Sequence, residues 1–108
     1  MAQKVNIVID QGTTFSTTFT ILDDNGNPVD FTNYSAQAQM RKSYSSSTSF
    51  EFGITLYSAG TVTLSMNAAT TGSISAGRYV YDVESQSPAG AVTRLVEGIV
   101  TITPQVTR

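Results

Sequence analysis

Apolar and polar residues alternate with a period of two along most of this chain. The odd positions are apolar in the segment 5–9, as at Ile7, and in 15–21 they carry Phe15, Phe19 and Ile21. Successive side chains of a strand point to opposite faces, so this alternation predicts strands with one buried and one exposed face. Further strands are predicted at 34–41, 50–56, 61–66, 78–84 and 92–103.

Turn residues separate these segments, and the densest turn signal is the run DDNGNP at 23–28. Seven or eight short antiparallel strands, with turns every 8–12 residues and no amphipathic helix, are typical of a β-sandwich. We therefore predict an all-β fold, an immunoglobulin-like β-sandwich that forms a single domain over 1–108. A small closed barrel is the alternative that the pattern leaves open.

Local irregularities are predicted at a few positions. Gly12 interrupts the first apolar pattern and is placed to pass the chain from one sheet to the other. Asn67 can cap a single helical turn, after which Ile74 is expected in the core. Gly98 is expected to mark a β-bulge in the last strand, and Phe50 and Leu56 are expected on one face of a single strand.

Composition narrows the chemistry that the chain can perform. The 108 residues carry a net charge of −2 and contain no Cys, His or Trp. Disulfides, Cys or His zinc sites, a Cys nucleophile and a His-dependent triad are therefore excluded. Without a basic excess the chain lacks the charge pattern that binds nucleic acid. We expect no enzymatic activity and no cofactor.

Targeting signals are not evident in the sequence. The first ten residues contain one Lys and an apolar run interrupted by Asn6, unlike a secretory signal. No stretch approaches the roughly 18 apolar residues of a membrane helix. We expect synthesis in a cytoplasm and no membrane partner.

The segment 76–83, AGRYVYDV, resembles the tyrosine corner of an immunoglobulin-type sandwich. Tyr79 occupies the position of the tyrosine whose hydroxyl bonds to an upstream backbone group. Tyr81 stands where antibody domains place a cysteine. The resemblance implies a buried Tyr79 in a sandwich without a disulfide.

Two more segments, GNPVDFT at 26–32 and RLVEGIVTITPQVTR at 94–108, extend this likeness. Together with 77–83 they resemble small virion structural proteins of tailed bacteriophages, which are related in pattern to the immunoglobulin-like N-terminal domain of phage baseplate upper proteins. The resemblance implies a self-assembling structural role in the neck, tail or baseplate of a virion, after synthesis in the host cytoplasm. The implied partners are other virion proteins or further copies of this chain.

Carboxylates cluster at two places, and neither pattern favours a site. The run 23–30 lacks the Gly and Glu spacing of an EF-hand, so a hairpin turn is favoured over a calcium loop. Asp82 and Glu84 share one face of a strand, where Arg94 can pair with one of them. A solvated acidic stripe is favoured over a catalytic pair, and we predict no metal site.

Candidate interface residues lie in loops and at strand ends. The loop 43–49 mixes Tyr44 with serines such as Ser46, a composition found in antibody-type binding loops, although an inert, solvated hairpin tip is favoured because serine-rich tips are common. Tyr57 is expected to point outward, toward a partner or along a sheet edge. The terminal strands 4–9 and 99–103 offer edges for strand addition if they lie at the border of a sheet.

These observations support two functions. The first is a phage virion structural protein that acts through protein–protein assembly. The alternative is a carbohydrate-binding or adhesion β-sandwich module, which requires an exposed aromatic platform, for which Tyr44 and Tyr57 are the candidates.

Overall fold

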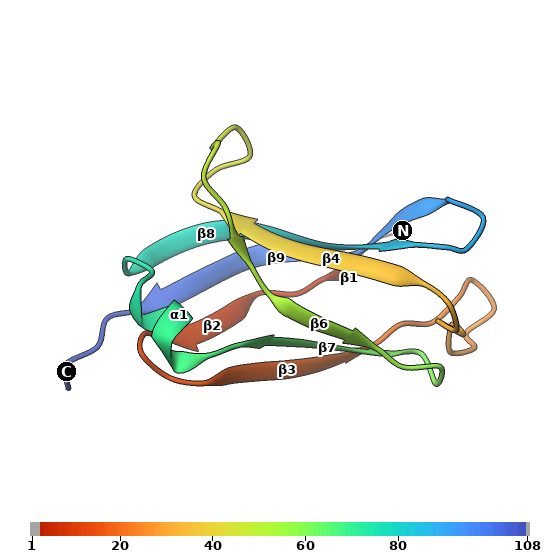
Figure 1. Ribbon diagram of the computed structural model, residues 1–108, viewed down its shortest axis with the longest axis horizontal. Coiled ribbons are helices and arrows are strands. Elements are labelled where there is room, and N and C mark those ends of the chain that lie inside the picture. The colour runs from red at the N-terminus through yellow and green to blue at the C-terminus, as the bar shows by residue number, and fades with distance from the viewer. Residues whose placement is uncertain (1–2, 108) are drawn as a thin grey trace.

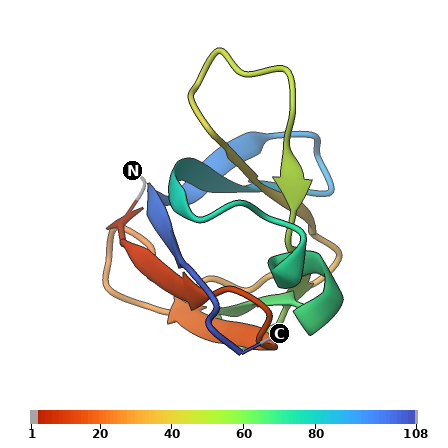
Figure 2. The ribbon, with the colours of Figure 1, turned by 90° about the vertical axis from the view of Figure 1, so that its left-hand side faces the viewer.

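Two β-sheets packed face to face form the fold in the computed structural model, which describes residues 3–107 (Figure 1). The end-on view shows the two layers and the 43–49 loop that projects from them (Figure 2). The elements are β1 (Gln3–Lys4), β2 (Ile7–Asp10), β3 (Phe15–Thr20), β4 (Ser35–Arg41), β5 (Phe50–Glu51), β6 (Gly53–Leu56), β7 (Thr61–Met66), α1 (Ala68–Gly72), β8 (Gly77–Gln86) and β9 (Val92–Thr103).

The larger sheet has the strand order β1-β9-β8-β4-β5, and β2 also pairs with β9. The smaller sheet has the order β3-β7-β6. The prediction of an all-β sandwich is confirmed. Among the described residues there are nine strands rather than seven or eight, because the first and the fourth predicted strands are each divided in two.

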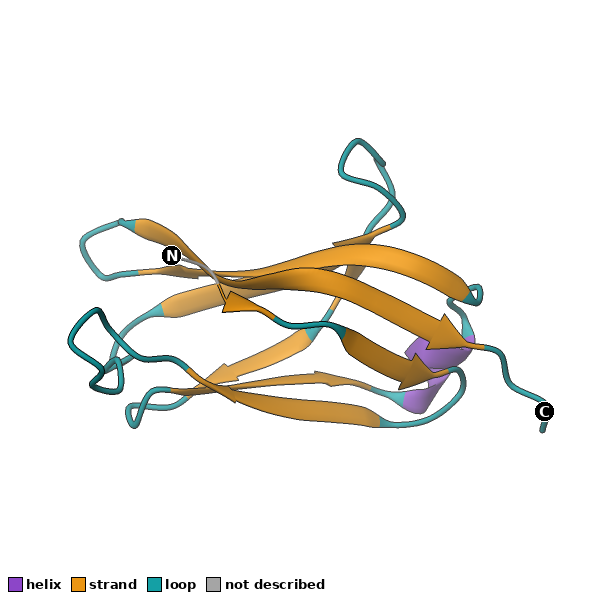
Figure 3. Ribbon diagram, turned by 180° about the vertical axis from the view of Figure 1, so that it is seen from behind, coloured by secondary structure: helices purple, strands orange, loops and turns teal. Residues whose placement is uncertain are grey.

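The expectation that every strand pairs antiparallel is wrong for the N-terminus. Strands β1 and β2 run parallel to β9, with Ile7 opposite Val100 and Asp10 opposite Thr103. Figure 3 shows this pair from behind, at the border of the larger sheet. A parallel pair cannot be joined by a hairpin, and here none is needed, because the two strands come from opposite ends of the chain.

The first crossing between the sheets occurs at Gly12, as predicted. Strand β2 belongs to the larger sheet and β3 to the smaller one. Gly12 has φ +81°, a left-handed conformation that costs glycine little. The amide and hydroxyl of Thr13 both donate to the Asp10 carbonyl, which closes the turn.

The predicted strand 50–56 is broken, and its halves lie in different sheets. Strand β5 pairs with β4, whereas β6 pairs with β7. Phe50, Phe52, Ile54 and Leu56 still pack against or within the core, so their shared face is as expected. The division occurs because the chain turns away from β4 after the Phe52 amide donates to the Ala38 carbonyl at 3.0 Å.

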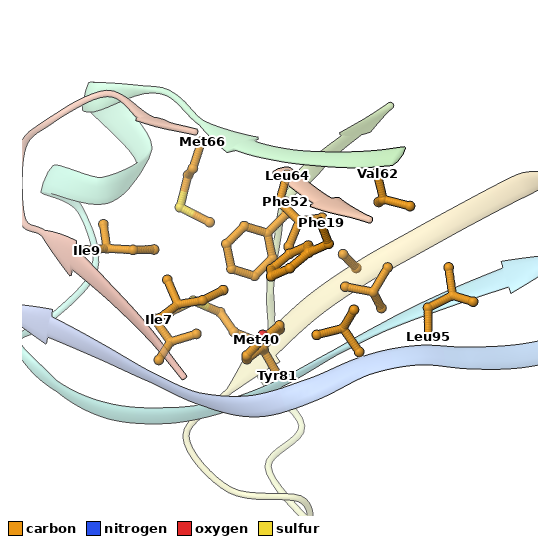
Figure 4. Packing of buried hydrophobic residues seen from close by; sticks show 14 of the residues in the cluster. Ile7, Ile9, Phe19, Met40, Phe52, Val62, Leu64, Met66, Tyr81 and Leu95 are labelled. Atoms are coloured by element: carbon orange, nitrogen blue, oxygen red, sulfur yellow. The ribbon is translucent and has the colours of Figure 1, made fainter. Parts of the chain in front are cut away.

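The core lies between the two sheets and combines side chains from both (Figure 4). Phe52 is at its centre, where its ring contacts those of Phe15 and Tyr81 with centroids 6.2 and 6.1 Å apart. Burial of such aromatic and aliphatic side chains contributes most of the stabilisation of a sandwich. The fully buried hydrophobic side chains include Ile9, Met40, Val62, Leu64, Ile74, Val83, Val96, Val100 and Ile102.

The bulge in the last strand is at Leu95 and not at Gly98, which corrects the prediction. Val83 pairs with Val96 but Glu84 pairs with Arg94, so Leu95 is the extra residue and both Leu95 and Val96 are buried. Gly98 is regular strand. A Cβ there would collide with the Val5 carbonyl, so glycine permits the close approach of the N-terminal chain.

The short helix α1 forms where Asn67 caps it, as predicted. The Asn67 side-chain oxygen accepts from the Thr70 amide at 2.8 Å, and Ile74 is fully buried just after the helix. The hydroxyl of buried Thr71 donates to the Thr13 carbonyl at 2.7 Å, which joins this turn to the first crossing. No helix within residues 3–107 is long and apolar enough to cross a membrane.

Tyr79 and Tyr81 both point inward from β8, and each hydroxyl reaches a backbone carbonyl. Tyr79 donates to Ser75 at 2.8 Å, which is the bond expected of a tyrosine corner. Tyr81 donates to Val5 at 2.7 Å and holds the N-terminal chain on Gly98, its partner across the sheet. The exposed side of the Tyr79 ring is covered by Lys42, whose Nζ is 4.8 Å from the ring centroid.

Removing the Tyr79 hydroxyl should destabilise the fold. We expect Tyr79→Phe to lower the free energy of unfolding by about 1 kcal/mol, since the hydrogen bond from the Tyr79 hydroxyl to the Ser75 carbonyl is lost. Chemical denaturation measures the change. The control is Tyr57→Phe, at an exposed ring, which should leave the midpoint unchanged. An unchanged midpoint for Tyr79→Phe would show that the corner adds no stability.

Stability should also fall at high pH through Tyr81. Burial raises the pKa of Tyr81 from 10.0 to about 12. Because the pKa of Tyr81 is higher in the folded than in the unfolded state, this group contributes its full stabilisation below pH 10. That contribution is lost as the pH rises through 12. We expect the free energy of unfolding to decrease over that interval, and the decrease to be smaller in Tyr81→Phe. Denaturation series across this range measure both slopes, and equal slopes would contradict the prediction.

Candidate functional site

The outward face of the larger sheet carries a shallow groove of about 350 Å³, which we call the outer-face groove. It exists because alternate residues of β8 point away from the core: Tyr79, Tyr81 and Val83 are buried, while Asp82 and Glu84 are partly exposed. Its side walls come from β4, β9 and the 43–49 loop. The lining includes Gln39, Arg41, Tyr44, Val80, Asp82, Glu84, Arg94 and Glu97.

One row of polar residues crosses the middle of this face from strand to strand. Asp82 of β8 is central in this row, because it lies opposite Gln39 of β4 on one side and Glu97 of β9 on the other. Glu97 in turn lies opposite Lys4 of β1. Directly opposite side chains in neighbouring strands are close enough to interact. The sheet register thus brings together residues that are up to 93 positions apart in the chain, from Lys4 to Glu97.

Arg94 forms the ionic centre of the groove. Its Nε lies 3.4 Å from Asp82 Oδ2, and its terminal nitrogen lies 3.2 Å from Glu97 Oε1. The expectation that Arg94 pairs across the sheet with one of the two acids is confirmed for Asp82. These side chains remain partly exposed, so the ion pairs orient the groups more than they stabilise the fold. Glu84 has no hydrogen-bond or ionic partner among residues 3–107.

Arg41 anchors the 43–49 loop to the sheet. One guanidinium nitrogen donates to the Ser46 carbonyl at 2.8 Å, and the other donates to Gln39 Oε1 at 3.1 Å. Ser46 also bonds through its hydroxyl to Thr48 within the loop. Tyr44, whose side chain is 85% exposed, therefore stands on an anchored loop beside the groove rather than on an unattached tip.

The three candidate interface residues do not form one surface. Tyr44 and Ser46 belong to the loop that rises from the larger sheet, whereas Tyr57 begins the turn between β6 and β7 at the far end of the smaller sheet (Figure 1). Tyr57 is 48% exposed and outward, as predicted. Only Tyr44 and Ser46 are therefore associated with the groove.

The acidic loop 23–30 uses its carboxylates to build its own turns. Asp23 accepts from the amides of Asn25 and Asn27 at 2.9 and 3.0 Å. Asp30 accepts from the hydroxyl and amide of Thr32, and these bonds lower the pKa of that carboxyl. Within the described part of the chain, no group of three or more acidic side chains could hold a metal ion.

Gln39 and Arg41 are among the residues of this site that the sequence analysis missed. Gln39 and Arg41 have the polar parity of an exposed face, which signals exposure and nothing more. Their role depends on the loop conformation and on the neighbouring strand, neither of which the alternation encodes. Of the terminal segments, only the N-terminal one meets the condition for strand addition, because β1 and β2 lie at a sheet border while β9 is interior.

No family model matches this sequence, and no curated protein matches it. The fold is similar to a solved mutant of the SrpA adhesin from Streptococcus sanguinis, with a TM-score of 0.52 and 14% identity over 92% of this chain. An internalin-like protein of Listeria monocytogenes aligns over 94% of this chain with a TM-score of 0.48 and 18% identity. The chain spans 55% of the adhesin chain and 28% of the internalin-like chain. The likeness to the adhesin shows the sandwich fold.

The anchoring of the loop by Arg41 can be measured directly. We expect Arg41→Met to increase fast backbone motion at Tyr44 and Ser46, seen as lower heteronuclear NOE values in NMR relaxation. Overall stability should change by less than about 1 kcal/mol, because the lost contacts lie at the surface. Arg78→Met, at an exposed arginine elsewhere on the same face, is the matched control. Unchanged NOE values in Arg41→Met would mean that the loop is held by other contacts.

Proposed function

We propose that the chain is a non-enzymatic recognition module of the adhesion type, which binds its ligand in the outer-face groove. The observation that carries this proposal is the loop that Arg41 fixes beside the groove, with Tyr44 on it. A rigid exposed tyrosine supplies contact area at a small cost in side-chain entropy. Binding then needs little ordering of the loop.

The groove suits a neutral ligand that is rich in hydroxyl groups, such as an oligosaccharide. Its lining has two arginines and three carboxylates, so the local charge does not attract a strongly anionic ligand. Carboxylate, amide and guanidinium groups offer many acceptors and donors, and Tyr44 offers a face for stacking. The Glu84 carboxylate, which has no hydrogen-bond or ionic partner among residues 3–107, can accept a hydrogen bond from a hydroxyl group of the ligand.

The similarity of fold to a streptococcal adhesin supports an adhesive role. It supports that role only through the shared architecture, since 14% identity carries no site residue from one protein to the other. Adhesion by a small module depends on many copies, because each weak contact gains from the others.

A second candidate is the virion structural role. The feature that favours it is the likeness of 26–32, 77–83 and 94–108 to small structural proteins of tailed bacteriophages. Assembly into a particle would use protein contacts with other virion proteins or with further copies of this chain. Mass spectrometry of purified phage particles distinguishes the two candidates, because only the structural role requires the chain in every particle.

Substituting Tyr44 should weaken ligand binding. On an array of neutral and sialylated oligosaccharides we expect binding to neutral members, and a loss of about tenfold or more in Tyr44→Ala, as for an exposed aromatic anchor. Tyr57→Ala, at the separate turn, is the control and should bind normally. Binding that Tyr44→Ala leaves intact, or no binding to any member of the array, would reject the oligosaccharide ligand.

A further inference from the structure

Strands β4 and β6 part from each other and leave a second groove, which we call the lateral groove. They are joined at the Phe52 amide, which donates to Ala38, and then diverge toward the right-hand end of the molecule (Figure 1). The opening between them has a volume of about 490 Å³. Its walls include Tyr34, Ala36, Ile54, Thr55 and Leu56.

The backbone of β6 presents unused hydrogen-bonding groups to this groove. Tyr57 donates its amide to Thr61 of β7, so the odd residues of β6 direct their backbone groups to β7. The alternate residues Ile54 and Leu56 therefore direct their N–H and C=O groups away from β7 and toward β4. These four groups have no hydrogen-bond partner among residues 3–107.

The facing edge of β4 is open in the same way. The Ala38 carbonyl that accepts from Phe52 shows that even residues of β4 direct their backbone groups to the β5 and β6 side. Strand β5 pairs only with Gln39 and Met40, so the N–H and C=O groups of Ala36 remain unpaired within the described residues. Unused donors and acceptors therefore line both sides of the lateral groove.

The interior of the groove continues the core. Tyr34, Ile54 and Leu56 are only partly buried, and each packs against the core cluster. A side chain entering between β4 and β6 would cover these three and gain contact with the layer between the sheets. The groove thus combines open strand edges with three partly buried apolar side chains in a lining that is otherwise mostly polar and uncharged.

Natural proteins usually protect an exposed sheet edge against pairing with a strand of another chain, but the edge of β6 lacks such protection. Natural sheets discourage edge pairing with charged side chains, especially lysine, or with proline. None of the described residues that line the lateral groove is charged or proline. The opposite side of the sandwich differs, because there Gln3 bridges to the Thr20 carbonyl at 3.3 Å, close to charged Asp23, Asp24 and Arg94.

We propose that the lateral groove accepts an extended strand from another protein, which pairs with β6 and covers Tyr34, Ile54 and Leu56 with alternate uncharged side chains. A strand is the occupant that can satisfy the unpaired groups of Ile54 and Leu56. The uncharged lining selects an uncharged segment, and the four residues of β6 match an insert of about four residues.

The test uses a synthetic seven-residue peptide of alternating threonine and valine, titrated into the isotope-labelled full chain and followed by NMR. We expect the amide signals of Ala36, Ile54 and Leu56 to shift, and hydrogen exchange at Ile54 and Leu56 to slow at least tenfold at saturation. The same peptide with N-methylated backbone keeps its side chains but loses its donors, and it should not bind. Equal binding of both peptides, or shifts confined to the outer-face groove, would overturn the proposal.

Protein variants provide the matched comparison. Ile54→Pro removes an amide hydrogen that points away from β7, so it spares the β6–β7 ladder while blocking the lateral groove, and it should weaken peptide binding at least tenfold. Ser16→Pro makes the equivalent change on β3, the other border strand of the smaller sheet, and should leave binding intact. If Ile54→Pro does not fold, the N-methylated peptide decides the matter alone. Self-association of the chain that Ile54→Pro abolishes would assign the groove to a second copy and overturn the proposal.

Discussion

The hydrogen bond from the Phe52 amide to the Ala38 carbonyl is the point on which the arrangement of the two sheets depends. On one side of it the chain belongs to the larger sheet as β5, and on the other side it belongs to the smaller sheet as β6. The same residue places its ring in the core against Phe15 and Tyr81. Because β6 leaves β4 at this residue, the sandwich is closed at one end of that side and open at the other.

The N-terminal chain is held by a different device on the opposite side of the molecule. Gly98 lets the Val5 carbonyl approach β9, and the Tyr81 hydroxyl donates to that carbonyl from the core side. Together these two contacts hold Val5, which lies in the segment that links β1 to β2. The Tyr81 hydrogen bond anchors the N-terminal chain without a covalent link.

The two proposed surfaces use different parts of the fold and different physics. The outer-face groove presents side chains, with Tyr44 on the loop that Arg41 fixes, and suits a ligand recognised by hydroxyl contacts and stacking. The lateral groove presents backbone groups of Ala36, Ile54 and Leu56, and suits a strand. The outer-face groove is the surface that the adhesive function would use, and the lateral groove is one that an assembly component could use to bind another protein.

The sequence by itself determined the sandwich class, the inward faces of its strands, the crossing at Gly12, the cap at Asn67 and the corner bond of Tyr79. Each of these is local, since side-chain parity, turn chemistry and capping depend on residues a few positions apart. Only the tertiary structure decided the parallel pairing of β2 with β9, the bulge at Leu95, the division at Phe52 and the meeting of Arg41 with Ser46 above Asp82 and Arg94. These features depend on strand register and on the sheet to which each strand belongs, which are set when distant strands pack together. The alternation of apolar and polar residues does not encode them, because it is the same in either sheet and in parallel or antiparallel pairs.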